Sequence, residues 1–188
     1  QSFGAQYKGK KTCSLAEVAA TSFFPAKPLG CYGDGGAVFT DDDDICAVMR
    51  SVRVHGQGGN KYDNVRVGIN GRMDTIQAAV LLSKLELFGG EIEARQRIAA
   101  RYGERLQGPL TVPRIPDGYT SAWAQYTVQS DRRDALTAAL KKENIPTAMY
   151  YPKPLHLQDA FSSLGYKEGD MPVSEAAARR VFSLPMHG

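Results

Sequence analysis

Prolines and glycines crowd into one short segment between two apolar stretches, and this segment most restricts how the chain can fold. Two prolines stand at its start, and four glycines occupy seven positions in G-C-Y-G-D-G-G at residues 30–36. Proline fixes φ and lacks an amide donor, whereas glycine permits turns that other residues avoid, so regular structure is interrupted here. The apolar residues 17–24 before it predict a buried strand, and residues 37–39 after it predict a second strand.

Four aspartates at positions 41–44 directly precede an apolar and basic stretch, I-C-A-V-M-R-S-V-R. Carboxylates there can cap free N–H groups and favour the helix dipole, so the pattern predicts the start of a helix rather than a metal site. Residues 55–71 are rich in glycine and polar side chains and predict a long loop, which is often functional.

The stretch from Met73 to about Leu106 has apolar residues at helical spacing, and the Gly89-Gly90 pair predicts a division into two helices. The remaining sequence alternates between strand and helix patterns, which predicts a small α+β domain. Its expected elements are a strand at residues 123–129, a helix at 132–144, a strand at 147–151 and a last helix at 173–182.

Composition places the chain among ordinary globular proteins and excludes several other classes. Of 188 residues, 43% are hydrophobic and 23% charged, and the net charge of +3 is too small and too evenly spread to indicate nucleic acid binding. Three cysteines without metal-ligand spacing indicate neither a disulfide framework nor zinc, and they favour a reducing, cytoplasmic setting. The longest apolar run is far too short to span a membrane. Because both ends lack typical terminal features, we expect an internal fragment.

Lys27 is the strongest candidate for chemistry because it lies outside any charged run. It stands between two prolines and follows two aromatic residues in S-F-F-P-A-K-P-L-G. Partial removal from water would favour a neutral, nucleophilic amine, as a Schiff-base lysine requires. The alternative is an ordinary solvated lysine, because most lysines are exposed.

The motif S-F-F-P-A-K-P-L-G followed by G-D-G-G-A resembles the pyridoxal-phosphate lysine segment of the DegT/DnrJ/EryC1/StrS family of nucleotide-sugar aminotransferases. The resemblance continues through R-V-H-G, G-I-N-G-R-M-D, Q-A-A, Y-P-K-P-L-H and S-L-P-M, and so covers essentially the whole chain. It implies an α/β, aspartate-aminotransferase-like fold (fold type I), with a large, mostly parallel sheet domain and a small α+β C-terminal domain. Residues 1–107 would complete the large domain and the connecting helices, and residues 108–188 would form an incomplete small domain.

Within the family, the lysine segment is most similar to enzymes that act on UDP-linked N-acetyl-hexuronic acids in O-antigen synthesis. The resemblance implies a homodimeric aminotransferase that uses pyridoxal 5'-phosphate (PLP) to move an amino group from glutamate to a keto carbon, at C3 of that sugar. Three alternatives remain open. They are another nucleotide-linked keto sugar with a C4 ketone or a dTDP carrier, a silent PLP-binding relative or regulator, and a sugar dehydratase, which Lys27 disfavours because histidine typically replaces the lysine there.

The resemblance also assigns residues to the cofactor. Lys27 would bind it covalently and then act as acid and base, and Ser22 would donate a hydrogen bond to its phosphate. Gln1 would approach the ring oxygen, and Asn70 would reach across a dimer interface to the partner's cofactor phosphate. The aspartate that contacts the pyridine nitrogen would precede this fragment, which we therefore expect to be inactive by itself.

Three residues are assigned to the substrate on the same basis. Arg72 would meet the nucleotide-sugar, and its planar guanidinium suits a diphosphate or carboxylate. Tyr150 and Tyr151 occupy positions where the hexuronic-acid enzymes have His-Tyr, so Tyr150 replaces a chargeable side chain with a neutral one. His55 and His156 could also line a pocket, but a lone histidine is more often structural.

Overall fold

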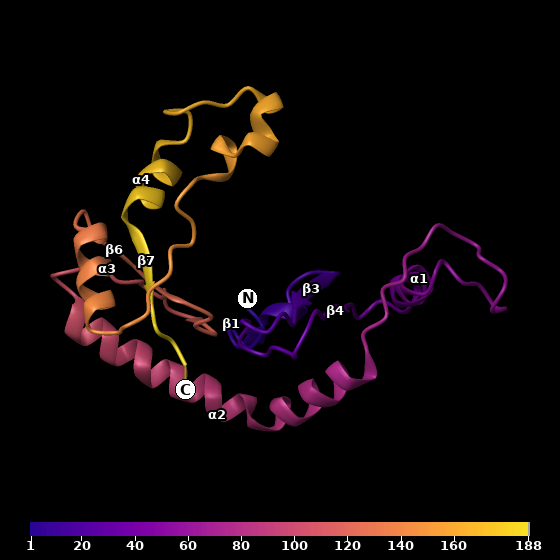
Figure 1. Ribbon diagram of the computed structural model, residues 1–188. Coiled ribbons are helices and arrows are strands. Elements are labelled where there is room, and N and C mark those ends of the chain that lie inside the picture. The colour runs from indigo at the N-terminus through magenta and orange to yellow at the C-terminus, as the bar shows by residue number, and fades with distance from the viewer. Residues whose placement is uncertain (188) are drawn as a thin grey trace. The chain divides into compact units, whose positions relative to one another are not determined.

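The computed structural model describes residues 1–187, which form two compact units. The first unit contains residues Gln1–Glu93 and Ile115–Ala124, and the second contains Ala94–Arg114 and the chain from Gln125 onward. Figure 1 labels the elements of both units. No helix of residues 1–187 is both long enough and apolar enough to cross a membrane.

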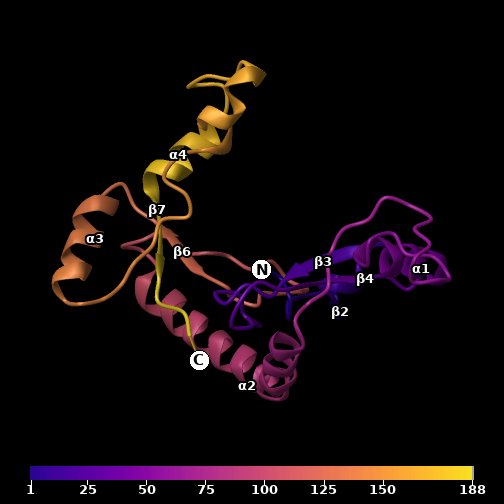
Figure 2. The same cartoon turned by 45° about the vertical axis from the view of Figure 1, so that its right-hand side comes forward.

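The first unit holds two small antiparallel sheets, helix α1 and the beginning of helix α2. In one sheet β1 pairs with both β2 and β5; in the other β3 pairs with β4, as Figure 2 shows. The elements are β1 (Gln6–Tyr7), β2 (Lys10–Lys11), a 3-10 helix (Thr12–Ser14), β3 (Ala19–Ser22), β4 (Gly36–Phe39), α1 (Asp43–Arg53), α2 (Thr75–Leu106) and β5 (Tyr119–Thr120). The predicted order of strand, turn and strand around residues 25–36 is thus confirmed, but β3 is half-buried to exposed rather than buried.

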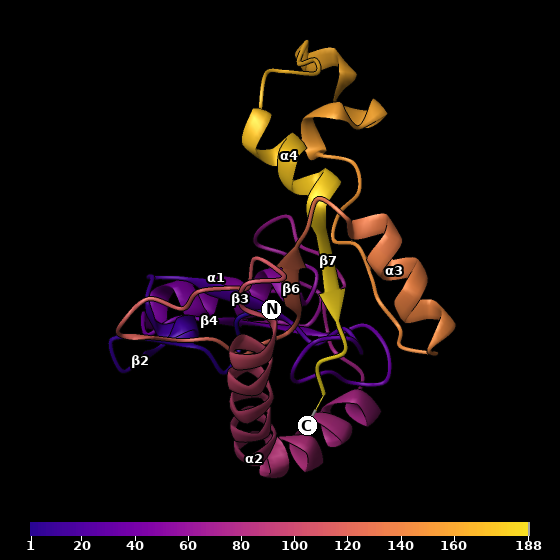
Figure 3. The ribbon, with the colours of Figure 1, turned by 90° about the vertical axis from the view of Figure 1, so that its left-hand side faces the viewer.

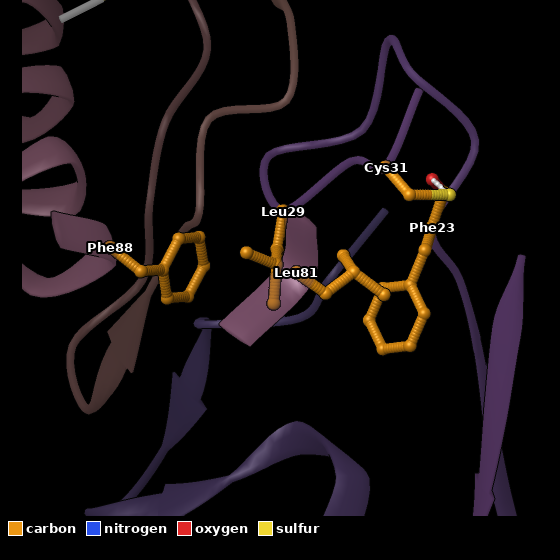
Figure 4. Packing of buried hydrophobic residues seen from close by; sticks show 5 residues of the cluster. All are labelled: Phe23, Leu29, Cys31, Leu81 and Phe88. Carbon is orange, nitrogen blue, oxygen red and sulfur yellow. Dashed lines mark hydrogen bonds between the residues drawn. The ribbon is translucent and has the colours of Figure 1, made fainter. Parts of the chain in front are cut away.

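The core of this unit joins the segment between β3 and β4 to helix α2. Phe23, Leu29 and Cys31 come from that segment, and Leu81 and Phe88 come from α2 (Figure 4). Each of these side chains is at most 8% exposed. Burial of the apolar side chains stabilises the unit by about 1.5–3 kcal/mol each, so the segment is packed against the helix rather than free in solvent.

Helix α1 begins as the aspartates predict. Asp42 is the N-cap, and its side-chain Oδ1 accepts a hydrogen bond of 2.8 Å from the Ile45 N–H. Asp43 and Asp44 lie in the first turn and Arg50 and Arg53 in the last, an arrangement that complements the helix dipole. The capping interpretation of the acidic run is confirmed.

The prediction that Gly89-Gly90 divides the long helical stretch is wrong. Helix α2 continues without interruption from Thr75 to Leu106, as Figure 1 shows. Each glycine costs about 1 kcal/mol relative to alanine in a helix, but the residues on both sides are good helix formers. Phe88 is buried beside the pair and Ile92 packs against the same core, so tertiary packing outweighs the local preference.

The second unit contains a two-stranded antiparallel sheet, two helices and the end of α2. Its elements are β6 (Tyr126–Gln129), α3 (Arg133–Lys142), 3-10 helices at Leu155–Leu157 and Asp159–Leu164, α4 (Pro172–Arg180) and β7 (Val181–Leu184). Strands β6 and β7 pair throughout their length, and Val128 and Phe182 meet across the ladder. Tyr126, Val128 and Phe182 are almost completely buried and form the centre of this unit.

Two predictions for this unit require correction. Residues 147–151 do not form a strand; Ala148 makes only an isolated bridge to Ser183, in a segment bracketed by Pro146 and Pro152. The last helix ends at Arg180 instead of residue 182, and Figure 3 shows β7 leading directly out of it. Pairing with β6 and burial of Phe182 favour the extended conformation there.

The uninterrupted course of α2 leads to a test of stability. Because a Cβ at Gly90 would meet no atom within 4 Å, we expect Gly90→Ala to stabilise the full-length protein by about 0.5–1 kcal/mol. Gly108, with a φ of +105°, is the matched control, since Gly108→Ala should destabilise. Urea unfolding midpoints measure both effects. Destabilisation by Gly90→Ala would contradict the assignment of open space beside this turn.

Candidate functional site

The segment that carries Lys27 is closed at its base by backbone hydrogen bonds. The Phe23 N–H donates to the Gly35 carbonyl at 2.8 Å, and the Cys31 N–H donates to the Phe23 carbonyl at 2.8 Å. Inside this closure, the Lys27 N–H donates to the Phe24 carbonyl at 2.8 Å and forms a tight turn. Residues 24–30 therefore form a compact loop, called here the lysine loop.

Gly30 permits the lysine loop to fold back on itself. A Cβ at this position would lie 2.6 Å from the Pro25 carbonyl oxygen and 2.7 Å from that of Phe24, closer than side chains tolerate. The Cys31 thiol continues the closure, because its Sγ lies 3.0 Å from the carbonyl oxygen of Phe23 (Figure 4) and 3.0 Å from that of Gly33. The end of the lysine loop is thus buried and closely packed.

The Lys27 side chain is half-buried, and its amine forms no hydrogen bond or ion pair with residues 1–187. Ser22 ends β3 and is also half-buried; its Oγ accepts a hydrogen bond of 3.2 Å from the Phe24 N–H. The serine proton therefore stays available for an acceptor such as a phosphate oxygen. Gln1 is exposed at the start of the chain.

Asn70 and Arg72 are brought together at the end of the long loop of residues 55–71. The Arg72 Nε donates to the Asn70 Oδ1 at 3.2 Å, and both side chains are exposed. The Asn70 backbone bridges to Val54, and the Gly71 N–H donates to the Arg53 carbonyl at 2.8 Å. The arrangement leaves the Asn70 amide protons and the terminal N–H groups of Arg72 free to bind an anion.

Close contact between Gly56 and Gly68 holds the long loop of residues 55–71 against the end of α1. A side chain at Gly68 would overlap the Gly56 nitrogen, and Gly56 itself has a φ of +74°. The His55 N–H donates to the Ile69 carbonyl at 2.9 Å, while the His55 side chain is exposed. The glycines therefore have a steric role that their motif alone did not reveal.

Tyr150 and Tyr151 lie in the second unit, on the segment between α3 and the 3-10 helices. Both are exposed, at 42% and 67%, and their rings meet edge to face with centroids 5.5 Å apart. The peptide bond between them is cis.

His156 forms a buried pair with Glu175, a residue that the sequence analysis did not identify. Its Nε2 lies 3.0 Å from the Glu175 Oε1, and both side chains are about 5% exposed. The same carboxylate accepts hydrogen bonds from the backbone N–H groups of Gly169 and Met171 at 3.0–3.2 Å. Its only sequence signal is one acidic residue at the start of an alanine-rich helix.

The surroundings of Glu175 act on its pKa in opposite directions. Burial raises the pKa of its carboxyl, whereas the N–H groups of Gly169 and Met171 and the His156 ring favour the charged form. The net result is a pKa below the usual range. Glu175 thus joins the His156 helical turn, the loop at residues 169–171 and α4, and His156 has the structural role that its sequence context favours.

The whole chain, residues 1–188, matches the model of the DegT/DnrJ/EryC1/StrS aminotransferase family. The chain therefore belongs to this family, and the predicted family is confirmed. A crystal structure of a family aminotransferase from Brucella abortus superposes with a TM-score of 0.94 and 53% sequence identity, covering 100% of this chain and 50% of that one. The predicted aspartate-aminotransferase-like α/β fold is confirmed. Within the described residues, however, β3 and β4 pair antiparallel rather than in a large parallel sheet.

Two relatives show the range of roles in the family. The chain is 50% identical over 188 residues to UDP-2-acetamido-2-deoxy-3-oxo-D-glucuronate aminotransferase from Pseudomonas aeruginosa, covering 100% of this chain and 51% of the relative. It is 45% identical over 190 residues to a pleiotropic regulatory protein from Geobacillus stearothermophilus, covering 99% of this chain and 51% of the relative. The chain thus spans about half the length of the curated relatives that it matches.

The lowered pKa of Glu175 predicts a pH-dependent contribution to stability. A carboxyl whose pKa falls on folding stabilises fully above its unfolded value, here 4.5, and this contribution is lost as the pH falls through the lower folded value. We expect Glu175→Gln to lower the melting temperature of the full-length protein by about 5 °C at pH 7. The difference from the unmodified protein should shrink below pH 4.5.

Thermal unfolding between pH 7 and pH 3.5 measures this effect in both proteins. Glu168→Gln, at an exposed position nearby, is the control and should change little at any pH. A destabilisation by Glu175→Gln that stays constant over this pH range would contradict the role of the charged carboxylate.

Proposed function

We propose that the full-length protein is a PLP-dependent aminotransferase that converts the keto group of a nucleotide-linked sugar to an amine. The observation that carries the proposal is the half-buried Lys27, whose amine has no partner among residues 1–187, on a closely packed loop in a member of an aminotransferase family. Such an amine is accessible to a ligand, and the closed loop fixes the direction from which it approaches, as a Schiff-base lysine requires.

The donor groups of this chain fit such a cofactor. Lys27 offers an amine for the aldehyde, and the hydroxyl of Ser22, five residues earlier, offers a proton to a phosphate. Asn70 would donate its amide protons to the phosphate in the partner subunit, and Gln1 would contact the ring oxygen. When bound, PLP withdraws electrons from the substrate carbon and so makes its proton easier to remove.

In this proposal, Lys27 has two successive tasks. Its Nζ would first hold the cofactor by a covalent bond and, once the amino substrate has displaced it, would carry the proton between the substrate carbon and C4′ of the cofactor. The closed base of the lysine loop keeps the backbone of Lys27 in place while the side chain moves between these tasks.

For the substrate, we propose a UDP-linked N-acetyl-hexuronic acid with a ketone at C3, and glutamate as the amino donor. The 50% identity to the Pseudomonas aminotransferase supports this choice over a C4 ketone or a dTDP sugar. Arg72 would bind a diphosphate or carboxylate, and Tyr150 and Tyr151 would supply neutral hydroxyl donors to the sugar. We also propose a role in lipopolysaccharide O-antigen synthesis, which the resemblance of the lysine segment implies.

We also propose a homodimer with shared active sites and no role for nucleic acid or membrane. Ile76, Leu82 and Leu87 on α2 are 76%, 67% and 67% exposed, which supports coverage of this helix by further protein surface. Residues 1–107 would belong to the large domain and residues 108–188 to the small one. The free cysteines Cys13, Cys31 and Cys46 support a cytoplasmic location.

A second candidate is a protein that binds PLP but acts in regulation without turnover. The 45% identity to the regulatory relative from Geobacillus stearothermophilus favours this alternative. The two functions differ in one step, because only an aminotransferase releases its cofactor from the lysine in the aminated form when glutamate is added.

The first test of the proposal is the covalent anchor. We expect borohydride reduction of the full-length protein, followed by peptide mass mapping, to give a pyridoxyl adduct on Lys27 and on no other lysine. Prior incubation with glutamate should abolish the adduct in an aminotransferase and leave it unchanged in a silent relative. Lys27→Ala is the control, and absence of any adduct after addition of PLP would contradict both functions.

A second test concerns the shared site. Separately, Asn70→Ala and Lys27→Ala proteins should each lose activity by about a hundredfold or more. After subunit exchange, each mixed dimer would contain one intact site, so an equal mixture should recover about a quarter of the normal activity. Aminotransferase assays before and after mixing measure the recovery. Failure of a mixture that demonstrably exchanges subunits would count against a site completed by the partner.

A further inference from the structure

We propose that Gln77 and Lys84 of helix α2 are positioning residues that hold the lysine loop in place for the chemistry of Lys27. This inference rests on the proposed function. The two residues are seven positions apart on α2, so they lie two turns apart on one face of the helix. Neither is assigned to the cofactor or to the substrate.

Lys84 holds the end of the lysine loop. Its Nζ donates a hydrogen bond of 2.6 Å to the carbonyl oxygen of Gly30, the residue at which the loop folds back. The ammonium also lies 5.6 Å from the centroid of the Tyr32 ring, within the range of a cation–π contact. Lys84 is half-buried and has no carboxylate partner among residues 1–187. Its ammonium group therefore interacts with the Gly30 carbonyl and the Tyr32 ring instead.

Gln77 holds the residues that follow the loop. Its Oε1 accepts a hydrogen bond of 2.8 Å from the Tyr32 N–H. The same side chain is packed against Gly33, where an added Cβ would lie 3.1 Å from the Gln77 Nε2. Gln77 therefore satisfies a backbone donor, and an added Cβ at position 33 would press against its amide group.

The polar contacts of Gln77 and Lys84 lie on either side of an apolar contact made by Leu81. Leu81 lies between Gln77 and Lys84 on the helix and packs in the same buried cluster as Leu29 and Cys31 (Figure 4). Residues 29–32 are thus attached to α2 by a hydrogen bond, a buried side chain and a second hydrogen bond. Lys27 is two residues before residues 29–32, so their attachment to α2 fixes the backbone position of Lys27.

The chemistry of the contacts explains why polar residues are required. Gly30 is buried, so its carbonyl would lose a strong, charge-assisted hydrogen bond if Lys84 were replaced by an apolar residue. The loop would then open toward water to satisfy that carbonyl. Such opening would move Lys27 while leaving α2 intact, which separates a positioning role from a general contribution to folding.

The experiment uses full-length protein and four substitutions in two matched pairs. Lys84→Met and Gln77→Met remove the hydrogen bonds, whereas Lys84→Arg keeps a charged donor and Gln77→Glu keeps an acceptor. Lys142→Met, at an exposed position in α3, is the control for replacing a helical lysine. Two quantities are measured, namely backbone hydrogen exchange of residues 24–33 without cofactor, and the rate at which added PLP forms the borohydride-reducible adduct on Lys27.

For both methionine variants we expect exchange in residues 24–33 to become about tenfold faster and adduct formation about tenfold slower. Exchange in α1 should not change, and the arginine and glutamate variants should stay within about threefold of the unmodified protein. If either methionine variant fails to fold, the other pair tests the proposal.

Two results would overturn the inference. One is an unchanged rate of exchange and adduct formation in the methionine variants. The other is faster exchange spread evenly over the whole first unit, which would indicate a general loss of stability. If the unmodified protein forms no adduct, the proposed function fails, but the exchange measurement still decides whether these residues hold the loop.

Discussion

The attachment of the lysine loop to helix α2 is the contact on which the first unit depends. Phe23 and Leu29 bury against Leu81 and Phe88, so the segment between β3 and β4 and the helix form one core. A loop rich in glycine and proline cannot supply regular hydrogen bonding of its own. Its conformation is therefore determined by packing against the helix and by the few polar contacts around that packing.

The same constraint links structure to the proposed chemistry. An amine that must form a covalent bond and later move a proton needs a backbone fixed to within a fraction of an ångström. In the lysine loop, the carbonyl groups of Phe24 and Pro25 come close to Gly30. In the long loop of residues 55–71, the backbone of Gly56 comes close to that of Gly68. In both places the absence of a side chain allows a short, closely packed path for the backbone.

Sequence patterns predicted the parts of this arrangement that depend on local rules. The turn signals at residues 25–36, the Asp42 cap and the apolar spacing of α2 each act within a few residues. Contacts distant in sequence were not predictable in this way: Lys84 meets Gly30 across 54 positions, and Glu175 meets His156 across 19. The division at Gly89-Gly90 was predicted wrongly for the same reason, since the packing of Phe88 and Ile92 outweighs helix propensity.

The two units hold their candidate residues by different physical means. In the first unit, sterically closed turns and apolar packing hold the lysine loop, and hydrogen bonds with Lys84 and Gln77 of α2 secure its end. In the second, the carboxylate of Glu175 joins the His156 turn to α4, and Tyr150 and Tyr151 lie on the segment that leads into this turn. A charge that organises several backbone donors can be rearranged by its surroundings more readily than a packed core. Under the proposed function, the covalent chemistry of Lys27 is therefore placed on a closely packed core, whereas Tyr150 and Tyr151 precede a turn that an ionised carboxylate holds.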